Sequence, residues 1–331
     1  MSRATRHIGD FWEWWLSAGA ADAERVLSSG KARRFSKEIS QRIEVIGPEL
    51  TWELAPGSTA KHALVITANG VAAGRGDVER WVLAAPPNGP TWEYYPSRQA
   101  NPSAMDDRLR LGAGEFAISA FRFAVNVHEP LAVLDIQIFH PQFPNLSTAA
   151  KQHLQFLVLD QLLGEDDVVR WIGTIEISDK EPIESVNGGG LRQAVMSLAA
   201  DIKPTTRMIK GKRDGYVFVT AVAYPLKWVD HPLLDTRIRL TFPIDDLTDL
   251  RLPSRSAIED IAGLEQGLLS VLENRGYLTS RMMSNGAAVS HLYIAQTDAQ
   301  AYEATKAAAA IWPGSTVTPL LDPGWQRALE F

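Results

Sequence analysis

The sequence predicts an α+β protein made of two α/β sandwich domains, of which the C-terminal one is ferredoxin-like. Stretches with an apolar residue at every third or fourth position, typical of amphipathic helices, alternate with short runs rich in Val, Ile and aromatics, typical of strands. From Thr236 onward these stretches follow the order β-α-β-β-α-β, which is the split βαβ arrangement, with one extra strand in front. The length of 331 residues also favours about two domains.

The domain limits follow from a change in composition. We expect a mixed α/β domain with two N-terminal helices at residues 1–185, a helix and linker at 186–212, and the ferredoxin-like domain at 213–331. A polar, turn-rich stretch that ends in Asn187-Gly188-Gly189-Gly190 marks the joint. A glycine run that enters a helix can bind phosphate, but no Lys-Ser or Lys-Thr pair follows this one. A flexible joint is therefore favoured over a nucleotide site.

The composition excludes several classes of protein. Hydrophobic residues make up 45% and charged residues 22% of the chain, as in ordinary globular proteins. Because Cys is absent, disulfides, thiolate zinc sites and Cys nucleophiles are excluded, which suits a reducing cytoplasm. No apolar run approaches the ~20 residues that span a bilayer, and the N-terminus lacks a signal-peptide pattern. The net charge of −6 argues against a general affinity for nucleic acid. We predict a cytoplasmic protein that does not enter a membrane.

Two amphipathic helices are expected to open the chain, at about 8–28 and 32–46. The first contains Phe11-Trp12-Glu13-Trp14-Trp15, which is either a ligand platform or an aromatic face docked on the domain. Aromatic residues at helical spacing are more often core, and so we favour docking. The next elements are strands at 50–54, 62–69 and 92–95, a short helix around 78–85, and a polar loop at 98–112.

The rest of the first domain is predicted to contain a hairpin, a helix, a strand and a final helix. The hairpin joins two β-rich runs, 116–127 and 131–139. Leu154, Leu157, Val158 and Leu162 mark one face of the helix, and Gly164 ends it. The strand is expected at 168–177 and the final helix at 191–202.

The C-terminal domain is organised around a helix at 256–275. Ser256 and Glu259 have the spacing of a capping box, in which each side chain accepts the other residue's backbone N–H. Gly276 follows where a left-handed residue often ends a helix. Apolar residues recur along one face at helical spacing. They are Ile258, Ile261, Leu264, Leu268 and Leu272.

Strands are expected at 216–224 and 236–242, and a hairpin follows the helix at 277–283 and 287–295. A two-residue turn at Asn285-Gly286 would mix polar and apolar residues on both faces. A three-residue loop that includes Ser284 pairs Tyr277 with Tyr293, Thr279 with His291 and Arg281 with Val289, and it gathers the apolar residues on the other face. Register follows the pattern that buries one face, and so we expect the three-residue loop. A helix at 298–312 and a strand at 316–320 complete the fold.

The helices of this fold cover one sheet face, and the other is a candidate binding face. Aromatic residues among arginines on an open sheet are typical of single-stranded RNA recognition, although the usual RNP motif is absent. The alternative is that the first domain or another subunit covers this face. The candidate residues are Arg237, Arg239, Tyr277, Arg281, His291 and Tyr293.

Three stretches carry a resemblance to a known family: Leu264 to Gly276-Tyr277, His291-Leu292-Tyr293, and Leu321-Asp322-Pro323-Gly324-Trp325. Over about residues 215–328 the chain resembles a bacterial domain of unknown function, which is similar in turn to the regulator of ribonuclease E activity type B. The resemblance implies an association with RNA metabolism but no catalytic residues. This chain departs from the regulator because it lacks a very acidic tail. Independently, Asp322, Pro323 and Gly324 favour a reversal that lays Trp325 back onto the sheet edge.

No catalytic or metal motif is recognisable. G-x-S-x-G, P-loop and H-E-x-x-H patterns are missing. His140, His153, Asp160 and Glu165 lack the spacing of metal ligands, and the acidic run that begins at Glu165 fits a solvated junction. We expect neither a metal nor a cofactor.

Three functional hypotheses follow. The first is a non-catalytic protein-binding or regulatory module whose partner is another protein. The second is an RNA-associated module, with RNA or a ribonuclease as partner, that uses the sheet face. The third is an enzyme of unrecognised class with a site between the domains, where pockets often lie. The sequence leaves the oligomeric state and the ligand open.

Overall fold

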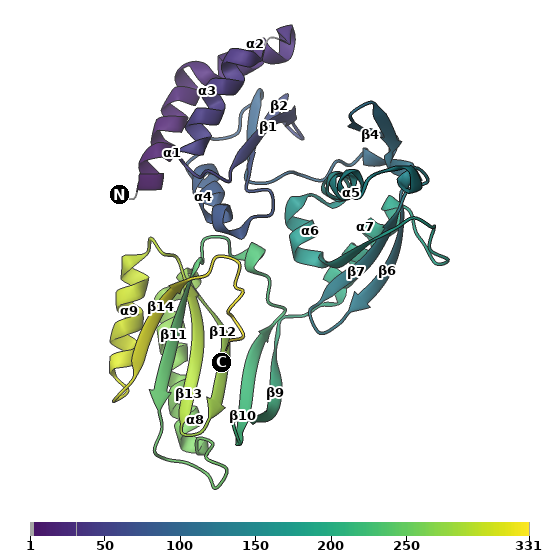
Figure 1. Ribbon diagram of the computed structural model, residues 1–331. Coiled ribbons are helices and arrows are strands. Elements are labelled where there is room, and N and C mark those ends of the chain that lie inside the picture. The colour runs from purple at the N-terminus through teal and green to yellow at the C-terminus, as the bar shows by residue number, and fades with distance from the viewer. Residues whose placement is uncertain (1–2, 31, 331) are drawn as a thin grey trace. The chain divides into compact units, whose positions relative to one another are not determined.

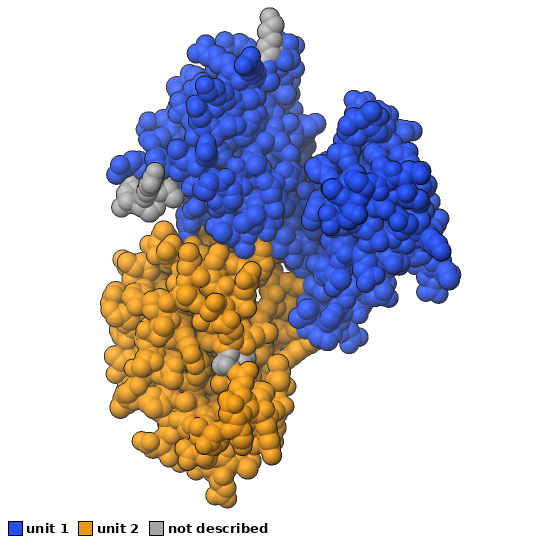
Figure 2. Space-filling view, viewed as in Figure 1, with its two compact units in different colours: residues 1–202 blue, residues 203–331 orange. Residues whose placement is uncertain are grey.

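The computed structural model describes residues 3–30 and 32–330 and confirms the α+β class (Figure 1). The chain divides into two compact units, Met1–Ile202 and Lys203–Phe331 (Figure 2). Each unit has its own buried apolar core and is described by itself.

Unit 1 begins with a helix that runs from α1 (Arg3–Trp14) through a π-helical turn (Trp15–Gly19) into α2 (Ala20–Ser29). The π turn ends at Gly19, where a larger residue would not fit, because a Cβ there would come within 2.9 Å of the Trp14 ring. The left-handed Gly30, with φ of 69°, ends α2, and α3 (Arg33–Glu44) follows. The two N-terminal helices that the apolar periodicity predicts are therefore present.

A three-stranded sheet and the helix α4 (Ala72–Leu83) pack against these N-terminal helices. The sheet has the order β1 (Thr51–Pro56), β2 (His62–Thr67) and β3 (Trp92–Tyr95). Trp12 stacks on Trp81 with ring centroids 4.7 Å apart and donates its indole N–H to the Trp81 carbonyl at 2.9 Å. Trp15 is fully buried and donates to the Tyr94 hydroxyl at 3.1 Å. The aromatic cluster is therefore core, as its spacing predicts, and not a ligand platform.

The rest of unit 1 packs three helices around short sheets. The strands are β4 (Arg108–Leu111), β5 (Gly114–Ala117), β6 (Arg122–His128), β7 (Val133–Phe139) and β8 (Ile172–Ser178). The helices are α5 (Thr148–Leu163), α6 (Glu165–Trp171) and α7 (Gly188–Asp201). The expected strand at 168–177 is wrong at its start, because three carboxylates in the first turn of α6 favour a helix there. The expected loop at 98–112 contains β4.

Unit 2 is a six-stranded antiparallel sheet in the order β14-β11-β13-β12-β10-β9. The strands are β9 (Thr205–Arg213), β10 (Tyr216–Tyr224), β11 (Thr236–Pro243), β12 (Gly276–Ser284), β13 (Ala287–Ile294) and β14 (Thr316–Leu321). The last four have the ferredoxin-like order. Two extra strands precede them instead of one, because β9 forms within the residues 186–212 assigned to a helix and linker. β9 is a mostly exposed edge strand rich in Lys and Arg, and it shows little apolar alternation.

The helices α8 (Arg255–Leu272) and α9 (Ala299–Ala310) lie on one side of this sheet, and the C-terminal end of the chain crosses the other side (Figure 1). Leu240 of β11, Leu268 of α8 and Leu292 of β13 are buried in the same apolar core. The alternation along β11 and the periodicity of α8 therefore predict the interior of unit 2 correctly.

Both ends of α8 differ from the expected caps. The N-cap is Ser254, whose hydroxyl accepts the Ala257 N–H at 3.2 Å, and Glu259 pairs with Arg255 at 2.9 Å instead of closing a capping box with Ser256. Gly276 is extended, with φ of −150°, because it already belongs to β12. A Cβ at Gly276 would lie 2.6 Å from Leu272 Cδ1, and so close packing, not left-handed geometry, requires glycine there.

The hairpin between β12 and β13 has a two-residue turn, since Ser284 pairs with Ala287. Asn285 and Gly286 have φ of 42° and 77°, the geometry of a type I′ turn, and the expected three-residue loop is wrong. A β-bulge between Leu278 and Ser280 then shifts the register by one residue. The bulge restores the expected pairing of Tyr277 with Tyr293, whereas His291 pairs with Ser280 and Arg281 pairs with Ser290.

The observed cap of α8 predicts an asymmetric effect of two serine substitutions. Ser254→Ala should lower the free energy of unfolding by ~1 kcal/mol, because it leaves the Ala257 N–H without its acceptor. Ser256→Ala, at an exposed position inside the helix, should change it by less than about 0.5 kcal/mol. Urea unfolding followed by circular dichroism measures both, and equal losses would contradict the assignment of Ser254 as the cap.

Candidate functional site

The sheet face that the sequence predicts to be open is covered by the chain's own C-terminal segment, residues 322–330. Tyr293 is fully buried and donates its hydroxyl to Asp322 at 2.6 Å. Trp325, only 6% exposed, lies over Tyr293 with ring centroids 4.6 Å apart and donates to the Leu234 carbonyl at 2.7 Å. The predicted reversal before Trp325 is therefore present, but Trp325 lies over Tyr293 of the central strand β13 and not on the sheet edge.

The same segment also contacts the basic residues of that face through hydrogen bonds and an ion pair. Arg237 donates to the Arg327 carbonyl at 2.9 Å and pairs with Glu330 at 3.5 Å. His291 is fully buried with Nδ1 3.1 Å from the Ala328 carbonyl oxygen, and burial lowers the pKa of its imidazole.

The other three candidates do not form a shared surface. Tyr277 is half-buried, and its ring centroid lies 4.5 Å from that of His231 and 5.4 Å from that of Trp325, and so the C-terminal segment covers it in part. Arg281 points to the helix side, where it pairs with the buried Glu265 of α8, because the bulge in β12 changes its face. Only Arg239 is exposed. The six residues therefore provide no open platform on which nucleotide bases could stack.

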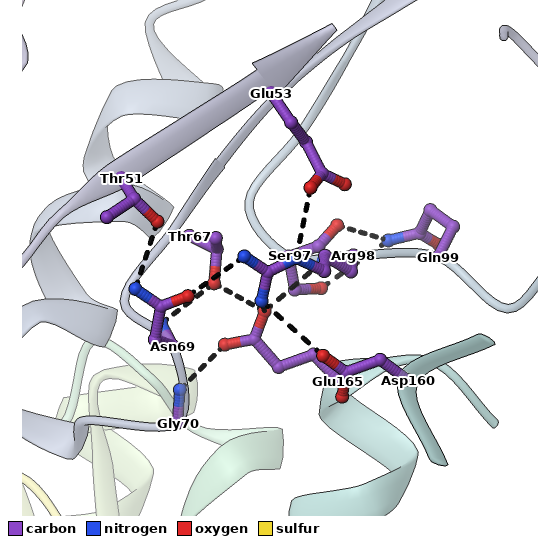
Figure 3. A network of polar contacts seen from close by, with 10 residues as sticks. All are labelled: Thr51, Glu53, Thr67, Asn69, Gly70, Ser97, Arg98, Gln99, Asp160 and Glu165. Carbon is purple, nitrogen blue, oxygen red and sulfur yellow. Dashed lines mark hydrogen bonds and ion pairs between the residues drawn. The ribbon is translucent and has the colours of Figure 1, made fainter. Parts of the chain in front are cut away.

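The strongest polar constellation lies in unit 1, around the guanidinium of Arg98 (Figure 3). Its Nε is 3.1 Å from a carboxylate oxygen of Glu53, and its Nη1 is 3.4 Å from Asp160 and 3.9 Å from Glu165. Its Nη2 donates to the Asn69 side-chain oxygen at 2.9 Å. A single positive charge is therefore shared by three carboxylates from three different elements.

Local structure holds each carboxylate in place. Glu53 projects from β1, Asp160 lies in the last turn of α5, and Glu165 is the first residue of α6. Glu165 is 6% exposed and accepts the Thr67 hydroxyl and the Gly70 N–H, the latter at 2.8 Å.

Glycine is required between α5 and α6. Gly164 has φ of 79°, and a Cβ there would lie 2.9 Å from the Ala100 backbone nitrogen. The segment that carries Arg98 can therefore approach closely, and the Arg98 carbonyl accepts the Glu165 N–H at 2.9 Å.

A cavity of about 490 Å³ lies beside the network. Glu53, Arg98 and Asp160 line its polar side, together with Asn101 and Gln161. Apolar side chains line the remainder and come from β1, β2 and α5. They include Ala55, Ala63, Val65 and Leu157.

Negative charges outnumber positive charges beside this cavity. Burial raises the pKa of Asp160 to about 6, and the lowering effect of Arg98 is partly cancelled by Glu165 and Glu53, which raise the pKa further. For Arg98, burial lowers the pKa of the guanidinium, but the three carboxylates outweigh burial and leave the pKa above its ordinary value. The pKa of Asp160 therefore lies near 6, well above that of an ordinary carboxyl.

A second buried carboxylate, Glu93, fixes the loop that forms another wall of the cavity. Glu93 is 1% exposed and accepts the backbone N–H groups of Ser58, Thr59 and Ala60 and the Thr59 hydroxyl. Burial raises the pKa of its carboxyl, but these hydrogen bonds outweigh burial and lower the pKa to about 2. The Ser58 hydroxyl lies 2.9 Å from the Tyr95 hydroxyl, and both residues line the cavity.

Sequence reasoning missed this site. It placed Arg98 at the start of a polar loop, treated Asp160 as part of a weak metal pattern, and interpreted Glu165 as a solvated junction. The carboxylates are far apart in the sequence and converge only because α5 and α6 pack against the segment after β3. The one local signal is Gly164, which both ends a helix and precedes an acidic first turn.

Among residues 3–30 and 32–330, no group of three or more His, Asp or Glu side chains is arranged to hold a metal ion. No helix in the same residues is long and apolar enough to cross a membrane. In comparisons with family models, curated proteins and solved structures, no match to this chain was found. The resemblance to the ribonuclease E regulator therefore stays a prediction.

The raised pKa of Asp160 predicts that its charge destabilises the folded protein. The folded state binds this proton more tightly than the unfolded chain, and so the penalty is present above about pH 6 and disappears as the pH falls toward 4. Asp160→Asn should raise the free energy of unfolding at pH 8 by at most about 3 kcal/mol, and by little near pH 4. Glu176→Gln, at an exposed carboxylate of β8 in unit 1, serves as control. Destabilisation at pH 8 would show that pairing with Arg98 dominates instead.

The lowered pKa of Glu93 predicts the opposite pH dependence. Glu93→Gln should lower the free energy of unfolding by about 2 kcal/mol near pH 7, because the charge-assisted hydrogen bonds to residues 58–60 are lost. The stabilisation by Glu93 is fully present above pH 4.5 and is lost as the pH falls toward 2. The difference between the two proteins should therefore narrow in urea titrations below pH 4.5, and a constant difference would contradict the assignment.

Proposed function

We propose that this protein is a non-catalytic binding module of a regulatory kind, and that unit 1 takes up a small organic cation in the cavity beside Arg98. The observation that carries the proposal is the charge of the network. Glu53, Asp160 and Glu165 supply three negative charges against the one positive charge of Arg98, which gives a net charge of −2 when all are ionised. A ligand with one or two positive charges compensates this excess.

The shape and lining of the cavity favour a compact molecule. Its volume of about 490 Å³ lies in the range of small-molecule sites. Val65 and Leu157 offer apolar contact, whereas Glu53 and Asp160 lie on the polar side. These features support a primary amine or guanidinium carried on a short apolar body. We also propose a cytoplasmic location, because a chain without Cys forms no disulfides and so needs no oxidising compartment.

Binding of the cation should be coupled to the loss of a proton from Asp160. A cation about 4 Å from this carboxylate favours its charged form and so lowers its pKa. Around pH 6, where half of the free protein carries this proton, binding should release it. The ligand therefore binds more weakly as the pH falls below about 6.

Isothermal titration calorimetry with putrescine, agmatine and arginine tests the proposal, with succinate as an anionic control. We expect at least one cation to bind with a Kd below about 1 mM at pH 8 and more weakly at pH 5. At pH 6 the binding enthalpy should depend on the ionisation enthalpy of the buffer, because a proton is released.

Asp160→Asn should weaken binding at pH 8 about tenfold or more, whereas Glu176→Gln should leave it unchanged. Tight binding of succinate, failure of all three cations, or unchanged affinity in Asp160→Asn would each reject the proposal.

A further inference from the structure

A hollow of about 410 Å³ lies in unit 2, on the side of the sheet that the C-terminal segment crosses, and we call it the arginine hollow. Its lining comes from β9, β11 and the C-terminal segment and consists of Arg213, Arg237, Arg239, Leu329 and Glu330. Glu330 supplies the carboxylate of this lining against three guanidinium groups. An apolar groove between α8 and α9 lies on the opposite side of the sheet.

The strand β11 holds two of these arginines in fixed positions. Arg237 and Arg239 share one face of the sheet, because residues two apart in a strand point the same way. β11 is hydrogen-bonded on both sides, to β13 and to β14. Burial lowers the pKa of the neighbouring His291, and Arg237 and Arg239 lower it further, since both guanidiniums repel a positive charge there. The two arginines therefore create a region of positive potential beside the C-terminal segment.

Arg237 keeps a hydrogen-bond donor that its present contacts do not use. The residue is 8% exposed, and its Nη1 donates to the Arg327 carbonyl and pairs with Glu330. Its Nε is buried and has no acceptor among residues 3–30 and 32–330. A buried N–H without an acceptor is costly, and a guanidinium binds an oxyanion best by donating two parallel N–H groups. An oxyanion that reaches Arg237 would therefore satisfy this donor.

The carboxylate that now faces the arginines is held loosely. The side chain of Glu330 is 53% exposed, and its Oε2 lies 3.5 Å from Arg237 Nη1 and 3.4 Å from Arg327 Nη1. Both distances exceed the ~2.7–2.9 Å of a charge-assisted hydrogen bond. The exposed guanidinium of Arg239 has no hydrogen bond or ion pair within the part of the chain that the structure describes. Glu330 therefore compensates the positive charge of the arginine hollow only in part.

A phosphate group suits the arginine hollow better than a second carboxylate does. Guanidinium groups match the geometry of both anions, but a terminal phosphate has three acceptor oxygens and nearly two negative charges near pH 7. Three oxygens can accept from Arg237 and Arg239 at once. Because a water molecule occupies about 30 Å³, the hollow also has room for an organic group beside the phosphate. Leu329, which is 47% exposed, offers that group an apolar contact.

We propose that unit 2 binds a phosphate group through Arg237 and Arg239, and that this group displaces the Glu330 carboxylate from Arg237. Arg213 lines the same hollow and adds to its positive charge. Glu330 is then an internal competitor of the ligand, because its carboxylate and the phosphate use the same guanidinium. A small phosphate monoester and free phosphate share this chemistry, and the comparison of probes below separates them.

Isothermal titration calorimetry of the full chain with phenyl phosphate tests the proposal at neutral pH and low salt. Inorganic phosphate and benzoate are the comparison probes, since each retains one part of phenyl phosphate, the dianion or the ring. We expect phenyl phosphate to bind with a Kd below about 1 mM and benzoate to bind at least about tenfold more weakly. Tighter binding of phenyl phosphate than of inorganic phosphate identifies an ester as the ligand, and equal binding identifies free phosphate.

Three substitutions connect the binding to the arginine hollow. Arg239→Gln removes an exposed guanidinium and should weaken the binding of phenyl phosphate about tenfold. Glu330→Gln removes the competing carboxylate and should strengthen it about threefold or more. Arg255→Gln is the matched control, because it removes the same charge from unit 2 at an exposed position of α8, on the other side of the sheet. This control should leave the affinity unchanged.

Three results would overturn the proposal: equal affinities for phenyl phosphate and benzoate, equal losses in Arg239→Gln and Arg255→Gln, or no gain in Glu330→Gln. A single-stranded RNA of about ten nucleotides examines nucleic acid as the competing ligand, because its phosphates are diesters with one negative charge each. RNA that binds more tightly than phenyl phosphate and is weakened by Arg239→Gln would show that the arginines contact nucleic acid, which would also overturn the proposal.

Discussion

Arg98 supplies the single positive charge for three carboxylates that come from β1, α5 and α6. Removing one partner of a buried ion pair costs several kcal/mol, because the other charge is left without compensation. Here the imbalance exists already in the native protein, since negative charge exceeds positive charge. Burial, together with Glu165 and Glu53, raises the pKa of Asp160. The close approach of Gly164 to the backbone at Ala100 lets the segment that carries Arg98 reach these carboxylates. Negative charge therefore exceeds positive charge around Arg98 in unit 1.

In unit 2 the dominant constraint is the covering of both sheet faces. α8 and α9 bury one face, and the C-terminal segment buries part of the other through Trp325 and the hydrogen bond between Tyr293 and Asp322. The bulge in β12 adds a link between layers, because it turns Arg281 toward the buried Glu265 of α8. With the central part of the sheet covered, the exposed apolar groove lies on the outer side of the helices.

The cavity of unit 1 and the groove of unit 2 differ in the residues that line them. Asp160, whose pKa is about 6, lines the cavity of unit 1. The affinity that we propose for a cation should therefore fall as the pH drops below 6. The groove between α8 and α9 is apolar, and Asp260 is the charged residue of its lining.

Local patterns in the sequence determine the α+β class, the βαββαβ order and the aromatic core of the N-terminal helices, because apolar periodicity depends on neighbouring residues. The cap at Ser254, the bulge beside Ser280 and the cover over Tyr293 depend on long-range packing, which periodicity does not record. The same holds for Arg98, whose carboxylate partners approach it only when distant helices and strands pack together. Side chains that meet through the fold carry no shared spacing in the chain, and so only the tertiary structure reveals the site.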